Sequence, residues 1–234
     1  MEILLLRHGK TRGNLEGRYI GRTDEPLPES SRQSLRQSPY RKYHPEFIYV
    51  SPMLRCRETA EILFAEDCVG NGSATGSEFH EANTEGMLPL GAVRDQAAPP
   101  GEKLRKTKFD NVIVVEDLRE KDFGTFENKN YEELKDEPAY QEWLDSGGTL
   151  AFPGGEGQKE FCLRCQRAFE FCLSDAVQKR ARKIAFVVHG GTIMAILEKY
   201  GIPEGDFYRW QLKNGEGYHC RCDADSEKLR LEIV

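Results

Sequence analysis

The sequence lacks the features of a membrane protein, a secreted protein or a nucleic-acid-binding protein. No apolar run among its 234 residues approaches the ~18 residues that a membrane span requires. The N-terminal apolar run, Ile3–Leu6, follows no basic segment, so it does not match a secretory signal. Basic residues are not in excess either, since 33 Lys and Arg face 39 Asp and Glu, a net charge of −6. We therefore expect a cytoplasmic protein that binds neither membranes nor nucleic acids.

Internal repeats and a second apolar core are also missing, which indicates a single domain. At about 150 residues per domain, the length fits one domain with an insertion. Residues 67–108 contain six glycines and three prolines but few apolar residues in a regular pattern. We interpret residues 1–234 as one domain with an insertion at about 67–108, because this stretch has no material for its own core.

The cysteines are few and odd in number, seven in all, and we expect reduced thiols. Cys162 with Cys165, and Cys220 with Cys222, have spacings that a zinc site can use. The first pair falls on an apolar stripe at helical spacing, however, and the second pair lies on one face of an expected strand. We favour core packing over metal binding for these cysteines.

Short apolar runs alternate with helical patterns along the chain. The expected strands are Glu2–Leu6, Phe47–Val50, Asn111–Val115, Ile184–Val188, Tyr218–Cys222 and Leu229–Val234. The expected helices run from about Met53 to Phe64, from about Gly157 to Gln178, and to an end near Tyr200. Strands that alternate with helices favour an α/β fold with a largely parallel sheet.

Residues able to carry chemistry follow four of the expected strands. Arg7 and His8 follow the first strand, Arg55 the second, Glu120 the third and His189 the fourth. In a parallel sheet the loops after the strands meet at one edge, where open α/β sheets bind their ligands. A single histidine at a strand end is more often structural, and a single arginine usually forms a surface ion pair. Five suitable residues at four strand ends indicate a shared site instead.

These residue types suit the transfer of a phosphoryl group. Two guanidiniums offer planar donors for phosphate oxygens. One imidazole can attack phosphorus and form a covalent intermediate, and a second, when protonated, can stabilise the charge of the transition state. A carboxylic acid can protonate the leaving oxygen and later accept a proton from water. The scheme requires no metal and no cofactor.

At these residues the sequence resembles the histidine phosphatase superfamily, which includes the cofactor-dependent phosphoglycerate mutases. The matching segments are Leu6–Asn14, Gly21–Leu27, Ser51–Ala60, Leu118–Glu120 with Phe123 and Gly124, Pro153–Glu156, and Val188–Gly191. They cover nearly the whole chain except residues 67–108. The resemblance implies a phosphoglycerate mutase-like fold, which is a three-layer sandwich with a mostly parallel central sheet flanked by helices.

The resemblance also implies a role for each candidate residue. His8 resembles the nucleophile that becomes phosphohistidine, and Glu120 resembles the general acid. The remaining residues of the implied phosphate pocket are Arg7, Arg55, His189, Asn14 and the backbone near Gly190. The pattern places the pocket arginine four residues after Ser51, which selects Arg55 over Arg57. Gly21 is an expected loop contact near the substrate.

The sequence departs from the family pattern on the substrate side. Ser31 stands where glycine is frequent, and Phe126 and Asn128 stand where a WxG motif is common. Mutases of this family use additional cations, but here no arginine occurs between Arg119 and Arg164. Residues 120–160 contain eleven acidic residues and only four lysines. We therefore expect hydrolysis of a phosphate monoester with an uncharged leaving group.

Within the superfamily, the motifs resemble those of the α-ribazole phosphatases, which act on a precursor of cobalamin. The alternatives are a phosphoglycerate mutase, a sugar-phosphate phosphatase, or an inactive module that binds phosphate. We expect the partner to be a small-molecule phosphate monoester, and the protein to be a monomer or a homodimer. The segment at about 121–156 follows a strand of the sheet, so we predict that it forms a cap over the substrate.

Overall fold

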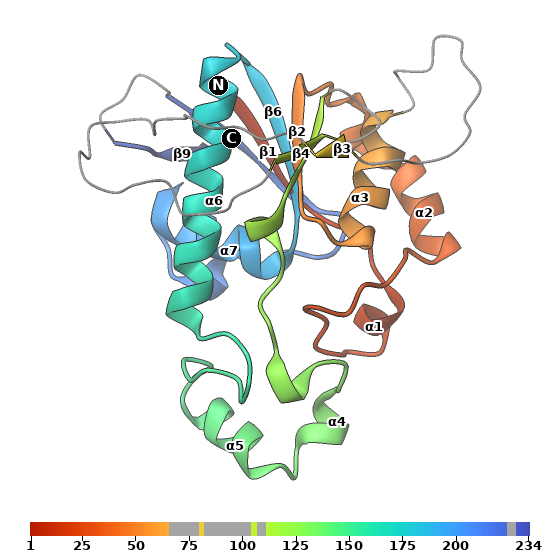
Figure 1. Ribbon diagram of the computed structural model, residues 1–234, viewed down its shortest axis with the longest axis vertical. Coiled ribbons are helices and arrows are strands. Elements are labelled where there is room, and N and C mark those ends of the chain that lie inside the picture. The colour runs from red at the N-terminus through yellow and green to blue at the C-terminus, as the bar shows by residue number, and fades with distance from the viewer. Residues whose placement is uncertain (66–79, 82–103, 107–110, 224–227) are drawn as a thin grey trace.

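The computed structural model describes residues 1–65, 80–81, 104–106, 111–223 and 228–234 (Figure 1). The described strands form one sheet in the order β3-β4-β5-β2-β6-β1-β8-β9-β7. They are β1 (Glu2–Arg7), β2 (Phe47–Val50), β3 (His80–Glu81), β4 (Leu104–Lys106), β5 (Val112–Val115), β6 (Lys183–Val188), β7 (Gly201–Ile202), β8 (Gly217–Cys222) and β9 (Leu231–Ile233).

The centre of the sheet is parallel. Strand β6 pairs in parallel with both β1 and β2, and β2 pairs in parallel with β5. Antiparallel partners follow on both sides, β4 beside β5 and β8 beside β1. The expected parallel α/β sheet is therefore confirmed in its central strands, and each of the first four expected strands ends within one residue of the observed end.

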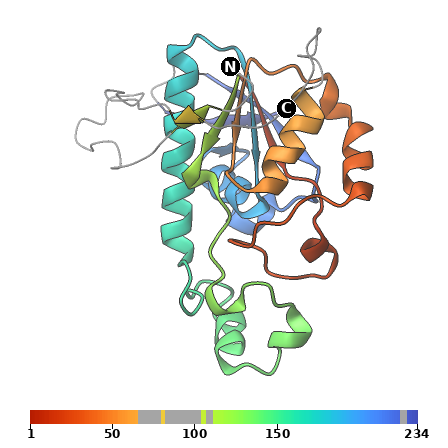
Figure 2. The same cartoon turned by 45° about the vertical axis from the view of Figure 1, so that its right-hand side comes forward.

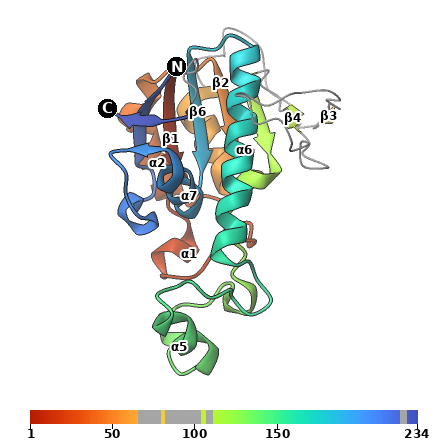
Figure 3. The same ribbon diagram turned by 90° about the vertical axis from the view of Figure 1, so that its left-hand side faces the viewer.

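Helices cover both faces of the sheet. The helices are α1 (Arg12–Leu15), α2 (Glu29–Arg36), α3 (Leu54–Ala60), α4 (Tyr131–Leu134), α5 (Pro138–Asp145), α6 (Gln158–Gln178) and α7 (Gly190–Tyr200). Short helical turns are η1 (Pro39–Lys42), η2 (Glu61–Ala65), η4 (Glu116–Leu118), η5 (Gly124–Phe126) and η6 (Phe207–Trp210). Helices α6 and α7 lie on one side of the sheet, and α2 and α3 lie on the other (Figures 1 and 3).

The two faces of β1 show why the fold has three layers. Ile3 and Leu5 are buried in the core that includes Phe169 of α6. Leu4 and Leu6, which point to the opposite face, are buried in the second core. Because a strand buried on both sides needs a cover on each face, its continuous apolar sequence requires helices above and below. The expected three-layer sandwich is confirmed.

The cysteines are part of these cores. The six described cysteines are all buried and free. Cys172, Cys220 and Cys222 pack in the core between the sheet and α6, and Cys162 and Cys165 pack in a smaller cluster with Phe207 of η6. Core packing, which we favoured over a zinc site, is confirmed for these five thiols.

Residues 121–156 project beyond the carboxyl ends of the central strands, away from the sheet (Figure 2). This segment, the predicted substrate cap, contains α4 and α5, neither of which the sequence pattern indicated. It has its own buried cluster, formed by Phe126, Leu134, Tyr140 and Phe152. The backbone N–H of Tyr19 donates to Lys129 O at 2.9 Å, which ties the cap to the loop after β1.

Most of the predicted insertion at 67–108 lies outside the described residues. Its described parts are β3 and β4, which extend the sheet beyond β5. In the part of the chain that the structure describes, no helix is both long enough and apolar enough to cross a bilayer.

Candidate active site

The register of the sheet brings the two candidate histidines together. Arg7 pairs with Val188 at the ends of the parallel strands β1 and β6, so His8 and His189 are the next residue on each strand. Their ring centroids lie 5.1 Å apart. Strand β2 is the other neighbour of β6 and leads into α3, which carries Arg55. The candidate residues that follow β1, β2 and β6 therefore lie together at the carboxyl edge of the sheet, as the sequence predicts.

His8 is held in a form suited to nucleophilic attack. Its side chain is buried, and Nδ1 lies 2.7 Å from the carbonyl oxygen of Gly9. A carbonyl only accepts a hydrogen bond, so Nδ1 carries the proton and Nε2 keeps its lone pair. Burial, Arg55 and Arg7 hold the pKa of His8 well below 6.5. The imidazole is therefore neutral in the free protein.

Each of the two arginines has a buried donor that contacts no acceptor in the described part of the chain. Arg55 is fully buried, and its guanidinium donates to Thr23 O at 2.8 Å and to Gly21 O at 2.9 Å. Arg7 donates to Leu212 O at 2.7 Å. The Nε atom of each is buried and has no hydrogen-bond partner among the residues that the structure describes. Burial lowers the pKa of Arg7; nearby Glu120 opposes this shift, and Arg55 adds to it.

The two buried guanidiniums give this part of the site a positive charge. Neither Arg7 nor Arg55 has an ion-pair partner among the described residues. Buried positive charges are unfavourable unless a negative group compensates them. A bound phosphate would supply that charge together with several acceptor oxygens.

His189 is buried and hydrogen-bonded within the site. Its Nε2 lies 2.7 Å from Ser51 Oγ, and the ring is fully buried. Burial, followed by Arg55 and His8, holds the pKa of His189 well below 6.5. This imidazole is therefore neutral in the free protein, because burial and the neighbouring guanidiniums all disfavour another cation. Its expected role in the transition state, which requires a proton, stays a prediction.

Glu120 faces the start of α7. Its Oε1 accepts from the backbone N–H of Lys121 at 2.9 Å, and its Oε2 accepts from that of Gly191 at 3.3 Å. A Cβ atom on Gly191 would overlap Glu120 Oε1, so glycine at this position permits the approach. These contacts place the carboxyl group at the start of α7, where it also lies close enough to Arg7 to act on its pKa.

A partly buried ion pair that we did not predict supports the segment around Glu120. Arg164 of α6 binds Glu156 with two hydrogen bonds, of 2.8 and 2.7 Å. Its Nη1 also donates to Asp117 O at 2.8 Å and to Arg119 O at 3.1 Å. Glu156 belongs to a segment that matches the family pattern, but nothing in the sequence indicates which of the cations in α6 is its partner.

Asn14 and Gly190, which the sequence predicts as phosphate contacts, lie near His8 and Arg7. Asn14 Oδ1 accepts from Thr11 N at 3.1 Å and from Asn214 Nδ2 at 3.1 Å, which leaves Asn14 Nδ2 as a donor. Asn214, which the sequence analysis missed, also donates to His8 O at 3.3 Å. A Cβ on Gly190 would lie 3.2 Å from the Arg7 guanidinium, so glycine allows this arginine its close position.

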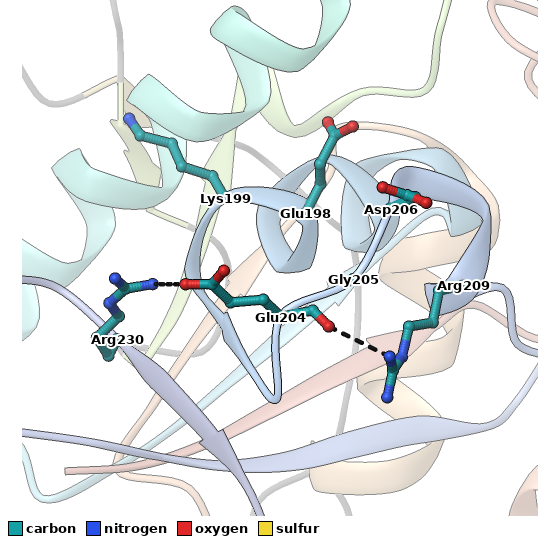
Figure 4. A pocket seen from close by; sticks show the side chains of 7 residues that line it. All are labelled: Glu198, Lys199, Glu204, Gly205, Asp206, Arg209 and Arg230. Carbon is teal, nitrogen blue, oxygen red and sulfur yellow. Dashed lines mark hydrogen bonds and ion pairs between the residues drawn. The ribbon is translucent and has the colours of Figure 1, made fainter.

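A surface pocket of about 650 Å³ lies elsewhere, beside α7 and η6 (Figure 4). Its lining residues are Glu198, Lys199, Glu204, Gly205, Asp206, Arg209 and Arg230. Arg230 forms an ion pair with Glu204 at 3.1 Å, and Arg209 donates to Glu204 O at 3.2 Å. None of the candidate catalytic residues lines this pocket, and its arginines are already engaged.

The fold and the site define a class of protein: an α/β protein that presents two neutral imidazoles and two buried guanidiniums at the carboxyl edge of its sheet. Such an edge suits a phosphate ligand. The family model of the histidine phosphatase superfamily (branch 1) matches residues 3–71 and 89–232. The chain belongs to this superfamily, whose members are phosphatases and mutases.

Named relatives carry both activities. A metal-independent phosphoserine phosphatase of Arabidopsis thaliana is 24% identical over 200 residues, which are 83% of this chain and 66% of that protein. A probable phosphoglycerate mutase, GpmB of Enterobacter sp. (strain 638), is 24% identical over 218 residues, 92% of this chain and 81% of that protein.

Solved structures share the fold. The α-ribazole phosphatase from Shigella flexneri superposes with a TM-score of 0.69 at 19% identity, covering 100% of this chain and 96% of that one. A putative α-ribazole-5′-P phosphatase from Escherichia coli gives 0.68 at 17% identity, covering 100% and 95%. The expected phosphoglycerate mutase-like fold is confirmed by these matches.

The two buried histidines predict how stability depends on pH. Folding holds the pKa of His8 and of His189 below 6.5, so each takes up a proton on unfolding when the pH is below that value. The free energy of unfolding therefore decreases as the pH falls from 6.5 toward the folded pKa, by up to about 1.4 kcal/mol per pH unit for each histidine. Urea denaturation across this range measures the slope. In His8→Gln the slope of the unfolding free energy against pH becomes smaller by the contribution of one histidine. An unchanged slope would contradict the prediction.

Proposed function

We propose that this protein hydrolyses phosphate monoesters through a phosphohistidine intermediate on His8, without a metal. The observation that carries the proposal is the state of His8: a buried, neutral imidazole whose Nδ1–H is bound to Gly9 O. Its Nε2 lone pair is therefore available beside two arginines that form no ion pair with any described residue.

In the first step, His8 Nε2 attacks phosphorus, and the bond between phosphorus and the ester oxygen breaks. Glu120, in its protonated form, gives its proton to the leaving oxygen. In the second step, a water molecule attacks the phosphohistidine and loses a proton to Glu120. The N–P bond breaks, inorganic phosphate leaves, and both side chains return to their initial states.

Arg7 and Arg55 would hold the phosphoryl oxygens during both steps. Guanidinium donors that are already in place need no rearrangement as negative charge develops in the transition state. Asn14 Nδ2 and the backbone at Gly190 are further donors. His189, which is neutral in the free protein, contributes a hydrogen bond, and a phosphate dianion beside it would favour its protonation.

We infer hydrolysis in preference to mutase activity because of the charge of the cap. A mutase must retain a second phosphate group, whereas residues 120–160 carry eleven acidic residues and four lysines. The motifs make α-ribazole 5′-phosphate the first substrate to test. Phosphoserine is the second, because a relative is a phosphoserine phosphatase.

The test measures phosphate release from α-ribazole 5′-phosphate, phosphoserine and 3-phosphoglycerate, all in the presence of a chelator. We expect release that the chelator does not reduce, with the highest kcat/KM for α-ribazole 5′-phosphate. A parallel reaction contains 3-phosphoglycerate and a trace of 2,3-bisphosphoglycerate. Rapid formation of 2-phosphoglycerate there would show a mutase, and no turnover of any ester would indicate an inactive binding module.

A further inference from the structure

Glu127, in the cap, is bound to the loop that follows α1. Its Oε1 accepts two backbone hydrogen bonds, from Gly21 N and from Thr23 N, both at 2.9 Å. Its Oε2 is buried and has no hydrogen-bond partner in the described part of the chain. The hydrogen bonds of the carboxylate therefore all go to this loop, and no cation pairs with it among the described residues.

The same two loop residues hold Arg55 from the other side. The carbonyl oxygens of Gly21 and Thr23 accept the guanidinium hydrogen bonds of Arg55, at 2.9 and 2.8 Å. Asp24, the next residue, accepts from Leu54 N at 2.6 Å at the start of the helix that carries Arg55. The Gly21–Thr23 loop thus connects the two side chains: its N–H groups bind the Glu127 carboxylate, and its carbonyl oxygens bind the Arg55 guanidinium.

The Gly21–Thr23 loop packs closely against the cap. A Cβ on Gly21 would overlap the carbonyl oxygen of Lys121 and would lie 3.1 Å from Glu127 Oε2. Glycine therefore lets the loop rest directly against the cap, next to Glu120. A shift of the carboxylate would move the two peptide units that determine where the Arg55 donors point.

We propose that Glu127 is a positioning residue that sets the Arg55 guanidinium through the Gly21–Thr23 loop. The inference rests on the proposed function, because it takes Arg55 to be a ligand of the phosphate group. It makes the cap part of the phosphate site as well as a cover for the leaving group.

The chain offers a matched control for this proposal. Glu133 also joins the cap to the N-terminal loop, through an ion pair with Arg18 at 2.8 Å. Arg18 donates as well to Asn128 O at 2.6 Å, but neither residue touches the carbonyl oxygens that hold Arg55. Loss of Glu133 loosens the cap without releasing Arg55.

The experiment measures the Kd for inorganic phosphate by calorimetry on the full chain. We expect Glu127→Ala to weaken binding about tenfold or more, the size of one hydrogen bond to a charged group. Glu127→Gln stays within about threefold of the wild type, because its amide oxygen still accepts both N–H groups. Glu133→Ala leaves Kd unchanged. If Glu127→Ala does not fold, Glu127→Asp, whose carboxylate is one methylene shorter, takes its place with the same expectation.

A double-mutant cycle separates positioning from general loosening. We expect Glu127→Ala to cause no further loss of phosphate affinity when Arg55 is already alanine. Equal losses in Glu127→Ala and Glu133→Ala, or a full additional loss in the Arg55→Ala background, would overturn the positioning role and leave the proposed function intact. If Arg55→Ala alone binds phosphate as tightly as the wild type, both the positioning role and the proposed phosphate site fail.

Discussion

His8→Ala loses hydrolysis of p-nitrophenyl phosphate, with kcat at least about 1,000-fold below the wild type. The physical reason is that the covalent intermediate needs a lone pair on a nucleophile, and alanine offers none. The other imidazole of the site does not substitute, because His189 Nε2 is hydrogen-bonded to Ser51 and the ring is fully buried. Binding of inorganic phosphate decreases far less than kcat, because Arg7 and Arg55 remain.

The measurement is a steady-state assay with a chelator present, together with acid-free trapping of protein that carries a labelled phosphoryl group. Wild-type protein is labelled during turnover, and His8→Ala is not. His219→Ala is the control: this exposed histidine lies on β8 and contacts Tyr40 and Tyr43, not the site. Full activity of His8→Ala would rule out the phosphohistidine route.

Glu120→Gln produces the second largest effect, and its size depends on the leaving group. An alkyl alcohol needs a proton as it departs, so kcat for an alkyl phosphate decreases about 10²- to 10⁴-fold. p-Nitrophenolate departs without protonation, so the first step with p-nitrophenyl phosphate is much less affected. A structural defect would reduce kcat for both substrates by the same factor. Loss of a general acid reduces kcat for the alkyl phosphate much more than kcat for p-nitrophenyl phosphate.

The comparison requires kcat for an alkyl phosphate and for p-nitrophenyl phosphate in each variant. Single-turnover measurements isolate formation of the phosphohistidine from its hydrolysis, in which Glu120 acts as a base. Glu116→Gln is the matched control, since Glu116 is an exposed carboxylate that precedes Glu120 in the same segment. Equal losses for the two substrates in Glu120→Gln would argue against the general acid.

Local patterns in the sequence were sufficient for the elements that build the core. Phe47–Val50 is a strand with the predicted bounds, and α6 begins one residue after the predicted start. Continuous apolar strands and an amphipathic helix are determined by short-range periodicity, which a single sequence displays. The helix expected from Met53 to Phe64 is α-helical only to Ala60 and continues as the π-helical turn η2.

The short helices α4 and α5 were not predicted, because tertiary contacts stabilise them more than their own sequence does. Their apolar residues Leu134 and Tyr140 are buried against Phe126 and Phe152, which come from the ends of the cap segment. Helices of this length are marginal without such packing. Their existence therefore depends on residues that are distant in the sequence.

The sequence by itself showed that His8, Arg55, Glu120 and His189 each follow a strand, and the loops after parallel strands meet at one edge of a sheet. Only the tertiary structure decided the charge state of His189 and the contacts made by Glu127 and Arg164. Glu127 binds Gly21 across 106 positions of the chain, and Arg164 binds Asp117 across 47. A pKa and a hydrogen bond both depend on the burial and the neighbours that folding creates, and no local pattern carries that information.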